Sequence, residues 1–349
     1  MSEFLAFSEE LLRVAANLAQ RHDALVAVTR REDALSSSMF FVTKGTREYL
    51  VLKRYAGDVG TTVGARGPET EARLAAFIAE RASVLTTRLE TERALSEIVT
   101  QYRALKMPLA TSLAARILRE LDYAGMLGED LMVVGTNAFA AYQLEAGARF
   151  VGLQDETEDV DLAWCRGSGI ALAARGTGER TPSLLAVLRK VDAGFRINNA
   201  KPWQALASDG YAVELLVAPS LFKTLPPRDA FSPMAIFQEQ EWLLRGRPVR
   251  QVAVSRDQKT CPIYAPDPRW MALHKMWLAR KPERDPKKKP KDAAQGDFLM
   301  DAVMERMQTA YPIDTDFVLD LPQELRSHFD RWAASRQFIP GRSHAPSFR

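Results

Sequence analysis

A strand pattern, a glycine turn and a helix pattern follow one another in LMVVGTNAFAAYQLEAG, residues 131–147. The first four apolar residues predict a short buried strand, and residues 138–147 predict a helix that Gly147 closes. Between them, Gly135 lets backbone amides approach a triphosphate, and Thr136 offers a hydroxyl to a phosphate oxygen. The segment predicts a phosphate-binding turn, although a Gly-Thr turn is common and carries little weight by itself.

Two carboxylates two positions apart mark the next predicted strand, VDLAWC at residues 160–165. Asp159 and Asp161 are at positions i and i+2, so on a strand they point to the same face. Like charges at this spacing repel one another and are tolerated when a cation lies between them, and Mg²⁺ prefers such oxygen ligands. The alternative is an edge strand with a solvated acidic face. The apolar residues between and after the two acids favour burial of the opposite face.

A third carboxylate, Glu214, lies within the apolar strand pattern YAVELLVAP, residues 211–219. A carboxylate in such a strand is costly unless it is paired, exposed or coordinated. If this strand lies beside residues 160–165, Glu214 completes a cluster with Asp159 and Asp161. Such a cluster suits catalysis with two divalent ions, either Mg²⁺ or Mn²⁺. An exposed position on an edge strand is the alternative for Glu214.

Taken together, these segments resemble the polymerase-beta-like nucleotidyltransferase superfamily. The shared order is a strand, Gly-[Ser/Thr], a helix, a strand with a hydrophobic-Asp-hydrophobic motif, and a third acid on a later strand. More narrowly, VVGTNAFAAYQLEAGARF, TEDVDLAW and VELLVAP are similar to a bacterial group of nucleotidyltransferase-fold proteins. The resemblance covers most of the chain and implies an α/β (α+β) nucleotidyltransferase core with a short mixed sheet. It also implies an N-terminal β-hairpin plus long helix before the core and a C-terminal helical domain after it.

The resemblance implies an enzyme that moves a nucleoside monophosphate from a nucleoside triphosphate to a hydroxyl acceptor and releases pyrophosphate. Asp159 and Asp161 would hold both metal ions. Glu214 would bind the catalytic ion and help to deprotonate the acceptor. Gly135 and Thr136 would cradle the triphosphate.

The chain departs from the superfamily pattern at two points. The 22 residues 137–158 separate Thr136 from Asp159, which is longer than the usual spacing, although the bacterial group shares it. Glu214 stands where Asp is commoner, and its longer side chain shifts the metal. The alternative function is therefore a catalytically inactive nucleotidyltransferase-fold protein that acts as a nucleic-acid-binding or scaffolding module.

The C-terminal third has some resemblance to the helical region of abortive-infection type nucleotidyltransferase toxins. The matching residues are HKMWLAR at 274–280 and KDAAQGD at 291–297. In those toxins a helix lysine faces the nucleotide, so the resemblance implies that Lys275 neutralises triphosphate charge. A surface lysine on an amphipathic helix is the alternative. For Lys291, Asp292 and Asp297, a solvated surface is the stronger interpretation.

We expect three regions along the chain. Residues 1–105 hold an N-terminal helix, a β-hairpin and a long helix, residues 106–255 hold the nucleotidyltransferase core, and residues 256–349 form the C-terminal helical domain. The hairpin is predicted at residues 39–55, around a Lys-Gly-Thr turn. Pro68 opens the long helix, whose apolar residues recur at near-heptad spacing. That spacing predicts packing against the rest of the chain or against a homodimer partner.

Composition indicates a soluble globular protein. Of the 349 residues, 46% are hydrophobic and 26% are charged, and the formal net charge is +3. No apolar run reaches the roughly 18 residues that a membrane span needs, and the N-terminus is acidic where a signal peptide is basic. We therefore expect a cytoplasmic protein with no membrane partner. Cys165 and Cys261 fit no metal or redox spacing.

Basic residues suggest the acceptor. The run RKPERDPKKKPK, residues 280–291, and the cations of the predicted hairpin could track a phosphate backbone. A solvated flexible loop is the alternative for the run. RNA, in particular a tRNA 3′ end, is the first expectation for the acceptor, while a protein hydroxyl or a small molecule stays open.

Overall fold

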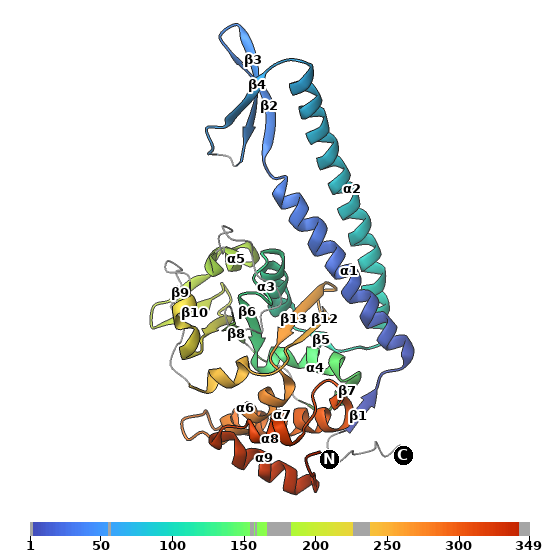
Figure 1. Ribbon diagram of the computed structural model, residues 1–349, viewed down its shortest axis with the longest axis vertical. Coiled ribbons are helices and arrows are strands. Elements are labelled where there is room, and N and C mark those ends of the chain that lie inside the picture. The colour runs from blue at the N-terminus through green and yellow to red at the C-terminus, as the bar shows by residue number, and fades with distance from the viewer. Residues whose placement is uncertain are drawn as a thin grey trace. The chain divides into compact units, whose positions relative to one another are not determined.

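The computed structural model describes residues 3–54, 57–153, 157, 159–165, 183–225 and 238–341. Its contacts divide the chain into two compact units (Figure 1). One unit is Asn17–Thr100, and the other combines Met1–Ala16 with Gln101–Arg349. We call the second one the core unit. The division of the sequence at residues 105 and 255 stays a prediction.

The unit Asn17–Thr100 contains a small antiparallel sheet and most of two long helices, α1 (Glu9–Ala34) and α2 (Pro68–Ala104). The sheet order is β2-β3-β4, so the expected hairpin is present and gains a third strand. That strand is short and follows a glycine-rich stretch, which gives little periodicity to read. The strands are β2 (Ser38–Lys44), β3 (Arg47–Lys53) and β4 (Thr61–Ala65).

The expected near-heptad seam on α2 is only partly covered. Val84, Leu95 and Val99 are buried, whereas Ile78 and Leu89 are both 58% exposed. Ion pairs between α1 and α2 join the helices inside this unit, such as Arg31 to Glu80 at 3.0 Å. The homodimer stays a prediction.

The core unit is built on a five-stranded mixed sheet with the order β6-β8-β11-β10-β9. β8 and β11 run parallel, and every other neighbouring pair is antiparallel. The strands predicted from the two acidic motifs therefore lie side by side. This confirms a mixed α and β fold with a short mixed sheet. The strands are β6 (Leu131–Val134), β8 (Asp159–Trp164), β9 (Arg196–Asn198), β10 (Lys201–Leu206) and β11 (Ala212–Leu216).

Helices and two smaller sheets surround this sheet. The amphipathic helix α3 buries Ile117, Leu118 and Leu121 in the apolar core. The expected helix after the Gly-Thr turn opens with a 3₁₀ turn, η1, before α4 begins. These elements are α3 (Ser112–Tyr123), η1 (Gly135–Ala138), α4 (Phe139–Glu145), α5 (Leu184–Val191), the three-stranded sheet of β5 (Leu109–Ala110), β12 (Val249–Ser255) and β13 (Thr260–Ala265), and the pair β1 (Glu3–Ala6) and β7 (Ala148–Val151).

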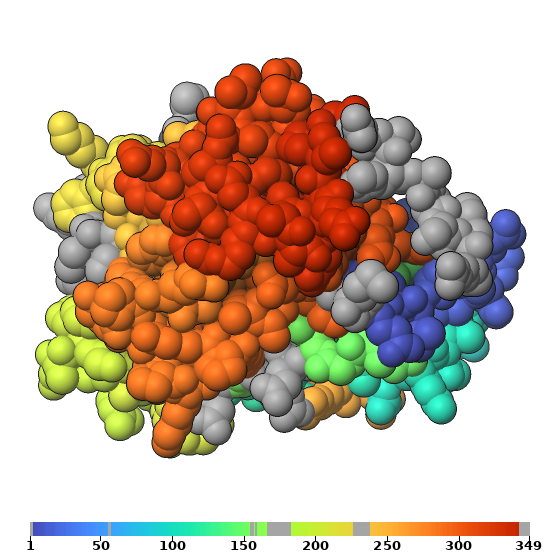
Figure 2. Space-filling view, turned by 90° about the horizontal axis from the view of Figure 1, so that it is seen from below, coloured from blue at the N-terminus to red at the C-terminus, as the bar shows by residue number. Residues whose placement is uncertain are grey.

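The C-terminal part of the core unit is helical, and Figure 2 shows the face that it forms in orange and red. α7 begins at Lys289, so the basic run expected to be a loop ends inside a helix, with Pro290 in its first turn. The fixed φ of proline suits that position. The elements are η2 (Pro219–Thr224), η3 (Gln238–Leu244), α6 (Pro268–Leu278), α7 (Lys289–Ala302), the π-helical turn η4 (Val303–Met307), α8 (Thr315–Leu319) and α9 (Gln323–Arg336).

None of the helices that the structure describes combines the length and apolar character needed to cross a membrane.

A buried carboxylate, Asp267, fixes the start of α6. Its side chain is 0% exposed and lies 2.7 Å from the Arg269 guanidinium. It also accepts hydrogen bonds from the backbone amides of Arg247 and Arg269, each at 2.9 Å. At Gly246, where φ is +74°, an added Cβ would lie 2.3 Å from this carboxylate. The glycine therefore lets the loop between η3 and β12 pack against the carboxylate that caps α6.

We expect Asp267→Ala to lower the free energy of unfolding of the core unit by about 3 kcal/mol. The change removes a helix cap and leaves a largely buried guanidinium without its counter-charge. Urea unfolding followed by tryptophan fluorescence measures this, because all six tryptophans lie in Gln101–Arg349. Asp320→Ala is the control, because its carboxylate is 65% exposed beside Arg245. The control should cost less than about 1 kcal/mol, and equal losses for the two variants would contradict the assignment.

Candidate active site

The glycine turn is built directly against one of the predicted acids. Val134, the last residue of β6, is paired with Asp161 of β8. Gly135 has φ of +72°, and an added Cβ would lie 2.6 Å from Asp161 Oδ2. A side chain at position 135 would therefore both strain the backbone and displace the carboxylate.

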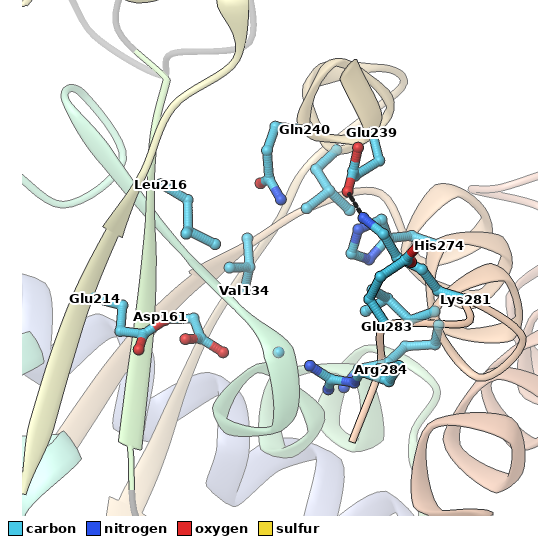
Figure 3. Close-up of a pocket in the computed structure, with 14 residues that line it drawn as sticks. Val134, Asp161, Glu214, Leu216, Glu239, Gln240, His274, Lys281, Glu283 and Arg284 are labelled. Carbon is cyan, nitrogen blue, oxygen red and sulfur yellow. Dashed lines mark hydrogen bonds and ion pairs between the residues drawn. The ribbon is translucent and has the colours of Figure 1, made fainter. Parts of the chain in front are cut away.

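Asp161 and Glu214 form an acidic pair on neighbouring parallel strands, at matched register positions. Both line a cavity of about 620 Å³, which we call the central cavity (Figure 3). From β10, Gln204 donates a hydrogen bond from Nε2 to Glu214 Oε1 at 3.0 Å. Asn198 in turn donates to Gln204 Oε1 at 2.6 Å. This amide relay holds the Glu214 carboxylate in place beside Asp161.

Asp161 lies in a strongly perturbing environment. Burial, followed by the charges of Asp159 and Glu214, raises the pKa of Asp161 to about 7, against the weaker opposing effect of Lys275 and Lys288. The local field therefore carries an excess of negative charge. Such a field favours a cation beside the carboxylates.

Asp159 shares the face of Asp161 but lines a different cavity, of about 980 Å³, which we call the Asp159 cavity. Thr157 Oγ1 donates to its Oδ1, and Lys288 Nζ lies 3.6 Å from its Oδ2. Within the described ranges, no three His, Cys, Asp or Glu side chains are already arranged to enclose a metal ion. The two-ion ligand set of Asp159, Asp161 and Glu214 stays a prediction.

Thr136 and Lys275 both lie near the turn, in contacts with the C-terminal helices. The Thr136 hydroxyl is buried, at 3.5 Å from Gln295 Nε2 of α7. Lys275 lines the central cavity, and its Nζ is 2.8 Å from Asp292 Oδ1. It is 4% exposed, so a free surface lysine is not what the structure shows. Their predicted roles at the nucleotide are untested.

His274 beside Lys275 is packed. Burial, reinforced by the Lys275 charge, lowers its pKa to about 3, so the ring is neutral at physiological pH. It stacks on Trp277 with an interplanar angle of 26°.

Three cations, Lys275, Lys281 and Arg284, line the central cavity on the side away from the acids, and each is paired with a carboxylate. Figure 3 shows Arg284 opposite Asp161 and Glu214. Arg284 is 2.7 Å from Asp292 Oδ2, so one carboxylate holds both Arg284 and Lys275. Lys275 was a predicted site residue, whereas Arg284 was not, although it lies in the basic run of residues 280–291.

The 3₁₀ helix η3 also lines the central cavity, above these cations in the view of Figure 3. Glu239 and Gln240 line the cavity there, and Lys281 Nζ is 2.8 Å from Glu239 Oε1. No motif in the sequence pointed to η3, because its polar residues follow no recognisable spacing.

The model of a protein family described as Nucleotidyltransferase matches residues 112–315. The match covers more than half of the chain, which therefore belongs to this nucleotidyltransferase family. The matched segment includes the glycine turn, the three acids and the helices α6 and α7. No curated protein and no solved structure matches the chain significantly.

We expect Asp292→Asn to lower the free energy of unfolding by about 3 kcal/mol near neutral pH, because it strips a buried lysine of its counter-charge. Burial alone would raise the pKa of Asp292, but Lys275 and Arg284 outweigh it and hold the pKa below its ordinary value of 3.8. The stabilisation is therefore fully present above pH 3.8 and is lost as pH falls through the lower folded-state pKa.

Urea unfolding of the wild type and Asp292→Asn at a series of pH values measures this difference. The two stabilities should converge only in strong acid. Asp330→Asn, at an exposed position on α9, is the control and should match the wild type throughout. A stability difference that does not shrink below pH 3.8 would show that Asp292 acts through packing alone.

Proposed function

We propose that this chain transfers a nucleoside monophosphate from a nucleoside triphosphate to a hydroxyl acceptor, with release of pyrophosphate and with a requirement for divalent metal. The observation that carries the proposal is the Asp161–Glu214 pair on parallel strands, built against the side-chain-free turn at Gly135. Membership of the nucleotidyltransferase family supports the reaction class.

The residues present suit Mg²⁺ or Mn²⁺. Carboxylate oxygens are the ligands that these hard cations prefer. The missing side chain at Gly135 leaves the Asp161 carboxylate open, and the mutual repulsion of the acids is relieved by a cation. In the proposal, Asp159 and Asp161 hold two ions and Glu214 binds the catalytic one. When bound, the ions activate the attacking hydroxyl and neutralise charge on the leaving pyrophosphate.

The chain itself supplies positioning and charge. The backbone at Gly135 and Thr136 cradles the triphosphate. Lys275 and Arg284, both held by Asp292, neutralise phosphate charge from the opposite wall of the central cavity. Glu214 accepts the proton of the acceptor hydroxyl, in the orientation that Gln204 gives it.

We expect Asp161→Asn and Glu214→Gln each to lower nucleotidyl transfer by about a hundredfold or more, because each removes a charged oxygen ligand while preserving shape. The assay incubates each α-³²P-labelled nucleoside triphosphate with protein, Mg²⁺ or Mn²⁺, total RNA and cell lysate. Asp316→Asn, exposed on α8, is the matched control and should retain activity.

Label that enters an RNA or protein band with the wild type alone identifies the acceptor class. A folded wild-type protein that transfers no label under any of these conditions, and binds no nucleoside triphosphate with Mg²⁺, would favour the inactive nucleic-acid-binding or scaffolding alternative.

We expect Gly135→Ala to lower transfer by a similar factor of about a hundred, since the new Cβ would push the Asp161 carboxylate out of position. Gly45→Ala separates this from backbone strain. Gly45 also has positive φ, +64°, but an added Cβ there would meet no atom within 4 Å. If Gly135→Ala and Gly45→Ala were equally active, the turn at Gly135 would not contribute to the active site.

A further inference from the structure

The Asp159 cavity is cationic as well as large. Arg256 enters it from the turn between β12 and β13, and Lys288 and Lys291 enter it from the start of α7. Among the residues that the structure describes, Asp159 and Asp209 are the acids that line it. If Asp159 binds metal, as proposed, its charge is compensated and the cavity is left strongly positive. A ligand in this cavity lies beside the acid that shares a face with Asp161, which is where an acceptor must approach.

Positive charge is crowded at this point. Burial, followed by repulsion from Lys275, lowers the pKa of Lys291. An anionic ligand relieves that repulsion, whereas a cationic acceptor such as an amino sugar would increase it. The cavity therefore suits an acceptor that carries phosphate.

A third cavity, of about 530 Å³, lies between the end of α6, the start of α7 and α9. We call it the α9 cavity. It is lined by Arg280, Lys289 and Arg331, together with Arg336, which is paired with Asp301 at 2.8 Å. Asp297 is the one acid among the described residues that line this cavity. Nothing in the proposed reaction uses this cavity.

His328 is a buried polar residue that lines the α9 cavity. The side chain is 8% exposed, and its Nδ1 has no hydrogen-bond partner among the described residues. Burial, followed by the charges of Arg331 and Arg280, lowers its pKa to about 4, so the ring is neutral. A neutral imidazole can complete the hydrogen bonds of a ligand that the surrounding cations attract.

The first turn of α7 connects the two cationic cavities. Lys288 and Lys291 line the Asp159 cavity, whereas Lys289 between them lines the α9 cavity. A single phosphate can occupy one cavity only. A chain of phosphates at regular spacing can cross the helix start and use both, with its end at Asp159.

We infer that the acceptor is the end of a single-stranded nucleic acid, held through successive phosphates by the α9 cavity and the Asp159 cavity. The inference rests on the proposed function, because it assigns the acceptor of that reaction. Phosphate contacts fix the register of a strand without reading its bases. Here they would place the terminal hydroxyl beside the acids.

Binding without catalysis tests the inference. The full-length protein is titrated against a short 5′-fluorescein-labelled single-stranded RNA at a fixed Mg²⁺ concentration, without nucleoside triphosphate, and anisotropy is measured at several concentrations of monovalent salt. Two double variants remove cations from one cavity each, Arg256→Ala with Lys291→Ala and Lys289→Ala with Arg331→Ala. The control, Lys190→Ala with Lys201→Ala, removes the same charge from exposed positions outside both cavities.

Each cavity variant should bind about tenfold more weakly, and the slope of log K against log salt should fall by about 1.4 for two lost phosphate contacts. The control should keep most of its affinity and slope. Cavity variants that behave like the control would overturn the inference. Inorganic phosphate and a nucleoside monophosphate serve as competitors. If equimolar monophosphate displaced the RNA, the acceptor would be a small phosphorylated molecule and not a strand.

The two proposals fail in different assays. If RNA binding depended on both cavities but no label were transferred, the two cavities would be an RNA-binding site and the proposed enzymatic activity would be contradicted. If label were transferred to another acceptor and RNA binding did not depend on the cavities, the proposed activity would be supported and the nucleic-acid acceptor contradicted.

Discussion

The unfavourable approach of Asp161 and Glu214 is the constraint around which the core unit is organised. Parallel pairing of β8 with β11 places the two carboxylates at the same level, and Asp159 adds a third charge close enough to raise the pKa of Asp161. Such repulsion costs stability in the apo protein. A fold retains such repulsion when a bound cation or a cationic group of a ligand offsets it. Destabilised charged groups of this kind concentrate at functional sites. Asp161 is therefore the acid that points to function, because its charged form is poorly compensated.

In the part of the chain that the structure describes, the cations of the central cavity pair with other carboxylates and not with Asp161 or Glu214. Asp292 holds Lys275 and Arg284 at 2.8 and 2.7 Å on the opposite wall. A direct ion pair between Lys275 and Asp161 would fill the site and neutralise it. The cavity between the acids and these cations therefore has room for a ligand that is itself charged, such as a metal-bound triphosphate. Asp292 is thus the counter-ion that stabilises the buried Lys275 and holds Arg284 beside it.

Local patterns in the sequence predicted β6, β8, β11 and the hairpin, because alternation and runs of apolar residues indicate which faces are buried. The adjacency of β8 and β11 could only be stated as a condition, since β10 and the long connections determine it. Arg284 and Gln204 were missed as site residues for a related reason. A charge on a loop or an amide on a strand gains its role from a partner distant in sequence, and no spacing records that partner. The start of α7 was hidden because its lysines resemble those of a solvated loop.

One close packing contact explains how the helices become part of the site. At Gly296 of α7, an added Cβ would lie 2.9 Å from the Ala272 carbonyl oxygen of α6. Asp292 is one turn before this glycine, and Lys275 is nearly one turn after Ala272, so the contact that fixes the interhelical distance also fixes the ion pair. From the same helix, Gln295 reaches the Thr136 hydroxyl beside the glycine turn. The helical region expected as a separate domain therefore supplies one wall of the central cavity, and a change at Gly296 would be felt at the acids although it touches none of them.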